Sequence, residues 1–272
     1  MIFDLHSHTT FSDGVLTPRE LVERAADKGV DVLSITDHDT VDAYQTMPLE
    51  LDAVRVIPGI EFSTQWQSLN IHVLGLNIEL HSDAIQAGTK LQTTARLERA
   101  QRIGENLAKM GIQGAYEGAL KLSAGGYIGR PHFAHHLVVA GTVRNVQTAF
   151  KKYLGTGKAG DVRQHWADLP QIIRWIRDAN GIPVLAHPLK YKITRTKLKR
   201  LLDDFIEAGG LGMEVVSGQQ QAQQTASLGL LCEQKGLLAS CGSDFHRPGS
   251  HWGELGVFAP LPDNVIPVWD RF

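Results

Sequence analysis

The sequence alternates short apolar segments with amphipathic ones, and most of the apolar segments end at histidine or aspartate. Residues 30–36, 182–186 and 237–241 each have the composition of a buried strand, and histidine follows each of them within a few positions. Helical patterns precede and separate them, and the first, before residue 30, is introduced by a capping box at Thr17 and Glu20. Strands that alternate with helices form parallel sheets, whose carboxyl ends meet at one edge. The pattern therefore predicts an α/β fold, closed or nearly closed into a β/α barrel.

The strand ends supply many imidazoles and carboxylates. The set is His6, His8, Asp13, His38, Glu61, His72, His187, Asp244 and His246. His6 and His8 are alternate residues of the first strand, so their side chains point to the same face. Convergent imidazoles and carboxylates repel one another or stay unpaired unless cations hold them. We therefore expect a metal centre at this rim, although His72 alone would be interpreted as a half-buried histidine within a strand.

The ligand types indicate which metals and which reaction to expect. Nine nitrogen and oxygen donors are too many for one tetrahedral zinc and suit two or three divalent ions with open positions. A set rich in imidazole and without thiolates favours manganese, with iron(II) or zinc as alternatives, over magnesium. Glu61 could bridge two of the ions. Neighbouring cations acidify a bound water and neutralise phosphate oxygens, so we expect phosphoester hydrolysis.

The alternation of strands and helices is interrupted in the middle of the chain. From residue 83 the pattern changes to consecutive helices, the first of them long and charged over residues 91–110. We expect a barrel domain of residues 1–82 and 163–272, with a helical insertion subdomain of residues 83–162. Within the barrel domain, we expect a short helix at 40–47, a turn at Pro58 and Gly59, and a last strand at 255–258.

Composition limits the partners and the location. The chain has 27 Lys and Arg against 29 Asp and Glu, which argues against a highly basic nucleic-acid coat. No apolar run approaches the length that crosses a bilayer, and the first residues enter the His6 strand directly. We therefore expect a cytoplasmic protein with no membrane association, and no protein partner is evident.

The strand-end residues resemble the four motifs of the PHP (polymerase and histidinol phosphatase) family. The motifs are H-S-H followed by Asp13, T-D-H ending at His38, A-H-P around His187, and G-S-D-F-H ending at His246. The resemblance covers the chain outside the insertion, and it implies a distorted (β/α)7 barrel with a trinuclear metal site. Carried over residue by residue, it assigns one ion to His6, His8, Glu61 and Asp244, a second to Glu61, His72 and His187, and a third to Asp13, His38 and His246.

Further motifs narrow the resemblance to a bacterial subgroup of nucleotide phosphatases. They are P-G-I-E-F-S-T around Glu61, I-H-V-L-G-L-N around His72, G-R-P-H-F-A around Arg130 and F-K-K-Y-L from Phe150. Members act on nucleoside 3',5'-bisphosphates, and some trim 5'-phosphorylated RNA from its 5' end. The resemblance implies hydrolysis of the 3'-phosphate of adenosine 3',5'-bisphosphate (pAp) to give AMP, and it makes small nucleotides and 5'-phosphorylated RNA the expected substrates. Residues 161–166 depart from the subgroup's pattern.

The insertion contributes the expected substrate-binding residues. Arg130 and His132 flank Pro131 at a predicted helix start, where a guanidinium, an imidazole and backbone N–H groups could hold a terminal phosphate. The resemblance assigns both to the 5'-phosphate and places them with Glu61 among the catalytic residues. The alternative is a helix-capping turn with an exposed arginine. Lys158 could extend a basic path for a second phosphate or RNA, although such lysines are more often solvated.

Other residues have expected supporting roles. Asp37 and Asp39 are expected to orient the imidazole of His38, because metal-binding histidines usually require such a partner. Trp66 and Trp252 could stack on a base, although burial is the commoner fate of tryptophan. No general acid is identifiable from the sequence.

Two rival functions remain. Histidinol-phosphate phosphatase belongs to the same fold but has no evident use for the helical insertion. A PHP-like module that binds metal or nucleotide without catalysis should lack ligands, whereas all nine are present.

Overall fold

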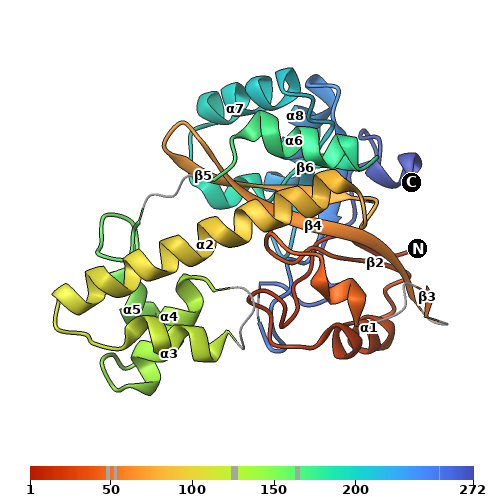
Figure 1. Ribbon diagram of the computed structural model, residues 1–272. Coiled ribbons are helices and arrows are strands. Elements are labelled where there is room, and N and C mark those ends of the chain that lie inside the picture. Colours follow the sequence, from red (N-terminus) through yellow and green to blue (C-terminus); the bar gives the residue numbers. More distant parts are fainter. Residues whose placement is uncertain (47–49, 52–53, 124–127, 163–165, 251) are drawn as a thin grey trace. The chain divides into compact units, whose positions relative to one another are not determined.

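The computed structural model describes residues 1–46, 50–51, 54–123, 128–162, 166–250 and 252–272 (Figure 1). These residues divide into two compact units. Unit 1 comprises Met1–Thr89 and Ala167–Phe272, and unit 2 comprises Lys90–Trp166. The expected domain boundaries at 82–83 and 162–163 stay a prediction, and residues 163–165 lie outside the described part of the chain.

Unit 1 is built on one sheet with a continuous path of seven strands. The strands are β1 (Phe3–Asp4), β2 (Val32–Ile35), β4 (Val54–Trp66), β5 (Leu69–Leu76), β6 (Ile182–Leu185), β7 (Gly212–Ser217) and β8 (Leu238–Gly242), paired in this order. The short β3 (Glu50–Leu51) pairs with β4 off this path. β5 runs antiparallel to β4 and β6, and the other pairs on the path are parallel.

The two ends of the strand order lie against each other. The N–H of Leu5, just after β1, donates to the Cys241 carbonyl at 3.0 Å, and the N–H of Asp244 donates to the His6 carbonyl at 2.9 Å. These hydrogen bonds join β1 to β8 and nearly close the sheet into a seven-stranded barrel. The predicted α/β class and the barrel are confirmed.

Helices cover the outside of the sheet. They are α1 (Pro18–Asp27), α6 (Leu169–Asp178), α7 (Arg195–Glu207) and α8 (Ala222–Gln234), with shorter turns η1 (Asp42–Gln45), η3 (Pro188–Tyr191) and η4 (Val268–Arg271). α1 contacts β2 and β4, α6 contacts β4, β5 and β6, and α8 contacts β7 and β8. α1 begins where the sequence predicts, because Thr17 Oγ1 accepts the Glu20 N–H at 3.3 Å and the Glu20 carboxylate accepts the Thr17 N–H at 2.8 Å.

Unit 2 is helical and has its own apolar core. The long helix α2 (Asp83–Lys109) starts in unit 1 and continues into unit 2, where α3 (Ala115–Leu122), α4 (Arg130–Val139), α5 (Val146–Ala149) and the π-helical turn η2 (Phe150–Leu154) follow. Phe133, Leu137 and Leu107 are fully buried in the core of this unit. Burial of such side chains stabilises the unit by about 1.5–3 kcal/mol each.

Some sequence-based expectations differ from the structure. Pro58 and Gly59 form no turn but lie inside β4, which pairs with β2 as far as Pro58 and with β5 from Gly59 onward. Residues 255–258 form no strand; Glu254 and Val257 make an isolated bridge around Gly256, whose φ is +67°. The short helix expected at 40–47 is the 3-10 turn η1, and residue 47 lies outside the described residues.

Closure of the barrel generates a prediction about Gly242, the last residue of β8. A Cβ atom at this position would lie 2.5 Å from His6 Cβ and 2.7 Å from His6 N. Because backbone cannot move aside as a side chain can, Gly242→Ala should cost about 2–3 kcal/mol and lower the melting temperature by several degrees. Differential scanning calorimetry measures both.

The matched control is Gly29→Ala. Gly29 has φ +74°, and a Cβ there would meet no heavy atom within 4 Å, so only the cost of a left-handed backbone, about 1 kcal/mol, is expected. Equal destabilisation by the two substitutions would contradict the claim that Gly242 permits closure.

Candidate metal centre

The nine predicted ligands lie in unit 1, and every one of them belongs to a group of ligand atoms within 4.8 Å of one another. The groups are His8, Asp13, His38 and His246; His6, His187 and Asp244; His6, His8 and Glu61; and His38, Glu61 and His72. The groups overlap, because His6, His8, His38 and Glu61 each occur in two of them. The nine side chains therefore form one continuous cluster capable of holding metal ions.

Strand direction explains why His72 joins residues that follow the ends of other strands. His72 is near the start of β5, opposite Ser63 of β4, and its carbonyl accepts the N–H of Ala186, just after β6, at 3.1 Å. Because β5 is antiparallel to its neighbours, its beginning lies at the rim where the parallel strands end. Glu61 reaches the same rim because β4 continues beyond Pro58.

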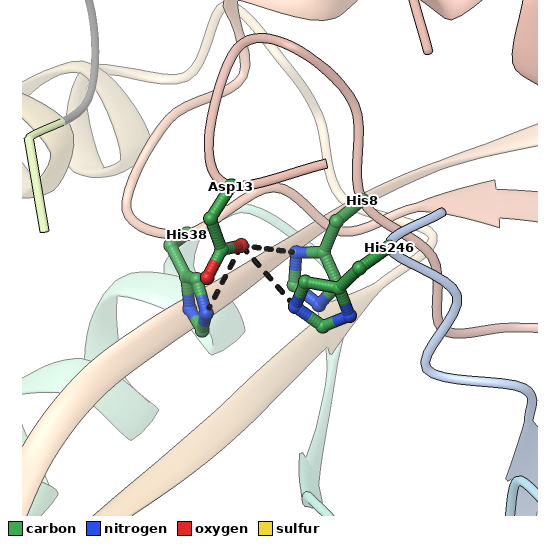
Figure 2. Close-up of side chains that lie close together, drawn as sticks. All are labelled: His8, Asp13, His38 and His246. Atoms are coloured by element: carbon green, nitrogen blue, oxygen red, sulfur yellow. Dashed lines mark ion pairs between the residues drawn. The ribbon is translucent and has the colours of Figure 1, made fainter. Parts of the chain in front are cut away.

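One carboxylate oxygen of Asp13 faces three imidazoles (Figure 2). Asp13 Oδ1 lies 3.2 Å from His246 Nε2, 3.7 Å from His38 Nε2 and 3.9 Å from His8 Nδ1. The three histidines come from three different parts of the chain, so this arrangement exists only in the folded protein. An oxygen and three nitrogens so placed form a mixed donor set suited to a divalent transition metal.

Glu61 is fully buried at the centre of the cluster, and five imidazoles surround its carboxylate. Oε1 lies 2.9 Å from both His72 Nδ1 and His187 Nε2, whereas Oε2 lies 2.9 Å from His38 Nδ1 and 3.4 Å from the Nε2 atoms of His6 and His8. The two oxygens thus face different imidazoles. A carboxylate that bridges two cations requires this division of its oxygens.

The nitrogen and oxygen atoms of the cluster are arranged to bind divalent cations, and their arrangement is poor for hydrogen bonds to one another. Asp13 Oδ1 and Glu61 Oε2 are buried, and neither has a hydrogen-bond partner among the described residues, although imidazole nitrogens surround both. His6 Nε2 and His8 Nε2 lie 3.1 Å apart, and both lie within 3.5 Å of Asp244 Oδ1. Buried polar atoms rarely lack hydrogen-bond partners, and cations bound between these oxygens and nitrogens would supply the missing interactions.

The environment sets the protonation of the donors before any ion binds. Burial, reinforced by neighbouring imidazoles, lowers the pKa of His8 well below its usual range, and burial lowers the pKa of His72 to about 4. Burial alone would raise the pKa of Glu61, but the surrounding imidazoles hold it well below its ordinary value. These groups are therefore already deprotonated near neutral pH.

His6 differs from the other imidazoles. Burial acts to lower its pKa, but the carboxylates of Glu214 and Glu61 outweigh burial and raise the pKa to about 10. Glu214 lies on β7, where Oε1 accepts the His6 Nδ1–H at 2.9 Å and Oε2 accepts the backbone N–H of His187 at 2.5 Å. One buried carboxylate thus orients His6 so that its Nε2 faces the cluster, and it also fixes the backbone of His187.

Asp37 supports the loop after β1. Its carboxylate accepts hydrogen bonds from the Thr9 N–H at 2.7 Å and from the hydroxyl of Ser12, and its expected role in orienting His38 stays a prediction. Ser12 Oγ also lies 3.3 Å from His8 Nδ1, so the Ser12 hydroxyl connects Asp37 to His8. Asp39 Oδ1 accepts the N–H of Ser63 at 2.7 Å and so joins the end of β2 to β4.

Sequence reasoning missed Lys190. It lies in η3 and forms an ion pair with Asp244 Oδ2. The next residue, Tyr191, donates from its hydroxyl to the Ala186 carbonyl at 2.8 Å and accepts the N–H of His72 at 3.1 Å. The only signal in the sequence was that both residues closely follow the A-H-P motif.

The residues expected to bind substrate lie in unit 2. Arg130 begins α4, and its Nη1 lies 3.3 Å from the Leu154 carbonyl and 3.9 Å from Asp161 Oδ1. His132 is in the first turn, where its Nδ1 accepts the Gly129 N–H at 3.2 Å, and Lys158 is exposed. The predicted helix start is present, and the roles of these three residues in substrate binding stay a prediction.

Glu214→Gln tests how His6 and His187 are oriented. A glutamine would place an NH2 group against either the His6 Nδ1–H or the His187 N–H, because both positions now hold an accepting oxygen. We expect a 10–100-fold loss of Mn²⁺ affinity, measured by isothermal titration calorimetry. Asp204→Asn is the matched control, since its carboxylate binds Trp66 Nε1. Equal affinities for both variants would contradict the orienting role.

The raised pKa of His6 predicts proton release on metal binding. At pH 8 its imidazole is protonated in the metal-free protein, because its pKa of about 10 lies above that pH. The proton must leave before Nε2 can bind an ion, so Mn²⁺ affinity should rise with pH between 6.5 and 9. Calorimetry in two buffers of different ionisation enthalpy measures the protons released, and no net release at pH 8 would contradict the prediction.

No helix among the described residues has both the length and the apolar character needed to span a bilayer.

Comparison with known proteins agrees with the geometry of the cluster. The 5'-3' exoribonuclease Rnm of Escherichia coli is 44% identical over 273 residues, which cover 99% of this chain and 93% of the relative. The 3',5'-nucleoside bisphosphate phosphatase of Chromobacterium violaceum is 40% identical over 270 residues, covering 98% of this chain and 94% of the relative. A solved structure from Chromobacterium violaceum, described as an amidohydrolase with bound sulfate and no metal, superposes with a TM-score of 0.90 at 38% identity, covering 100% of this chain and 95% of that one. Residues 4–178 match the PHP domain, and the chain therefore belongs to the PHP family of phosphoesterases.

Proposed function

We propose that this protein hydrolyses the 3'-phosphate of nucleoside 3',5'-bisphosphates, such as pAp, and trims 5'-phosphorylated RNA from its 5' end. The observation that carries the proposal is the single cluster of nine donors centred on the Glu61 carboxylate. The names of the two relatives, at 44% and 40% identity, support both substrates.

The cluster would hold two or three divalent cations, with Glu61 bridging two of them. Its mixture of imidazoles and carboxylates favours manganese, with iron(II) and zinc as alternatives. Such cations, when bound, acidify water and neutralise phosphoryl oxygens. Because the ligand groups overlap, the assignment of each residue to one ion stays a prediction.

The two proposed substrates require the same bond to break. The oxygen of water bonds to the phosphorus attached to O3' of the first nucleotide, the P–O3' bond breaks, and O3' takes up a proton. With pAp the products are AMP and phosphate. With RNA the products are a 5'-nucleotide and a shortened RNA that carries a new 5'-phosphate, which is again a substrate.

Arg130 and His132 would hold the 5'-phosphate of either substrate. A guanidinium and an imidazole in the first turn of α4 combine with the positive end of the helix dipole, which favours anions. The ion pair of Arg130 with Asp161 is long, at 3.9 Å, and partly exposed pairs of this kind contribute little energy. Nη1 also donates to the Leu154 carbonyl, and the other N–H groups of the guanidinium would bind the phosphate. Lys158 would contact a longer RNA.

A substrate panel tests the proposal. Manganese-loaded protein is assayed for phosphate release from pAp, 3'-AMP, 5'-AMP and histidinol phosphate, and for nucleotide release from a 5'-phosphorylated RNA oligomer. The proposal predicts strong preference for pAp and release of 5'-nucleotides from the RNA. Turnover of histidinol phosphate alone would refute the proposed substrates and leave the metal centre intact.

Arg130→Ala should mainly penalise substrates that carry a 5'-phosphate. A lost charge-assisted contact costs about 1.5–3 kcal/mol, so kcat/KM on pAp should fall roughly 10–100-fold, with much less effect on 3'-AMP. Lys121→Ala, on α3 of the same unit, controls for loss of a positive charge. Equal losses on pAp and 3'-AMP would count against the assignment.

A further inference from the structure

A cavity of about 490 Å³ in unit 1 opens beside the metal cluster. His187, Asp244 and His246 of the cluster form part of its lining, and Lys192, Arg247 and Trp252 form another part. We name this cavity, of whose lining these six residues are a part, the downstream pocket. Its volume is in the range of about 300–1,000 Å³ found for sites that bind small ligands.

The lining of the downstream pocket is cationic. Lys190 pairs with Asp244, the one carboxylate among the lining residues that the structure describes, so the excess positive charge comes from Lys192 and Arg247. Gln219 adds a side-chain amide to the lining, whereas the amide of Gln220 is bonded within the protein to Ser217, Val215 and Thr225. Ser217 Oγ is buried in the lining and has no hydrogen-bond partner among the described residues. The pocket therefore suits an anion with polar edges.

Trp252 adds a flat apolar surface. It is 77% exposed, whereas Trp66 and Trp175 are 5% and 8% exposed. Its carbonyl accepts the N–H of Gln219 at 2.9 Å, which fixes the backbone of Trp252 to the segment after β7. The indole is therefore exposed to solvent, while a hydrogen bond fixes the backbone that carries it. Aromatic side chains placed in this way stack on nucleobases, with little dependence on which base is present.

The position of the pocket relates it to the reaction. Because His187, Asp244 and His246 belong to both the cluster and the lining, a ligand in the pocket can be joined directly to a phosphoryl group at the cluster. In pAp that phosphorus carries no further substituent. In RNA it carries the second nucleotide through O5', with a base, a ribose and a further phosphate.

We propose that the downstream pocket binds the second nucleotide of a 5'-phosphorylated RNA, with its base stacked on Trp252 and its 3'-phosphate near Lys192 and Arg247. This inference rests on the proposed function and adds a site that only the RNA substrate uses. The stack and the cations hold the shortened RNA after each cleavage, next to the cluster that cleaves it again.

The experiment compares kcat/KM for a 5'-phosphorylated RNA hexamer with kcat/KM for pAp. We expect Trp252→Ala to lower the RNA-to-pAp ratio at least fivefold and Trp252→Phe to restore most of it, because phenylalanine still stacks. Arg247→Gln should lower the same ratio and weaken its dependence on salt. Ile266→Ala controls for removal of an exposed apolar side chain outside the pocket and should leave the ratio unchanged.

A second substrate locates the effect at one nucleotide. A hexamer with an abasic ribose at its second position should be cleaved several-fold less efficiently than the intact hexamer by the parent protein, and almost as efficiently as the intact hexamer by Trp252→Ala. If Trp252→Ala still cleaved the abasic hexamer several-fold less efficiently than the intact hexamer, the proposal would be overturned.

The outcomes separate this proposal from the proposed function. A parent protein that hydrolyses neither pAp nor RNA would refute the proposed function. A parent protein that hydrolyses pAp but not RNA would overturn the downstream pocket and leave the bisphosphate activity standing. Cleavage of both substrates, with a ratio that Trp252→Ala does not change, would overturn the downstream pocket alone.

Discussion

The contacts between the buried carboxylate of Glu61 and the imidazoles around it hold the site together. The carboxylate has no exposed surface, and each of its oxygens faces a different set of imidazoles. A buried charge is costly unless opposite charges or hydrogen bonds compensate it, so the cluster and the barrel rim that holds it must form together. Glu61 reaches this position because β4 leaves β2 at Pro58 and continues along β5.

The barrel maintains the cluster through buried contacts and a strained backbone. Glu214 links His6, after β1, to His187, after β6, and the hydrogen bonds between β1 and β8 bring Asp244 to the same rim. His187 and Asp244 have positive φ angles of 28° and 53°. Such conformations cost about 1–3 kcal/mol each and persist where the surrounding structure fixes them, commonly at functional sites. Placing these two ligands therefore lowers the stability of the fold.

Much of the fold was predictable because strands and helices alternate in the sequence and the strand ends carry His, Asp or Glu. The direction of β5 was not predictable, since one strand's pattern is the same in parallel and antiparallel sheets, and the position of His72 follows from that direction. Pro58 and Gly59 predicted a turn from local preference, but the change of pairing partner keeps β4 extended. Trp66 is buried against α7 through Asp204, a contact distant in sequence, whereas Trp252 is exposed.

The number of metal ions bound per chain shows whether the nine donors hold cations bridged by Glu61. Protein purified without chelator and loaded with Mn²⁺ is measured by inductively coupled plasma mass spectrometry, beside the Glu61→Gln variant. If one cluster holds bridged cations, the parent protein should bind two or three ions and the variant fewer, with no turnover of pAp. One ion or none in the parent protein, or full metal content and activity in the variant, would contradict the account.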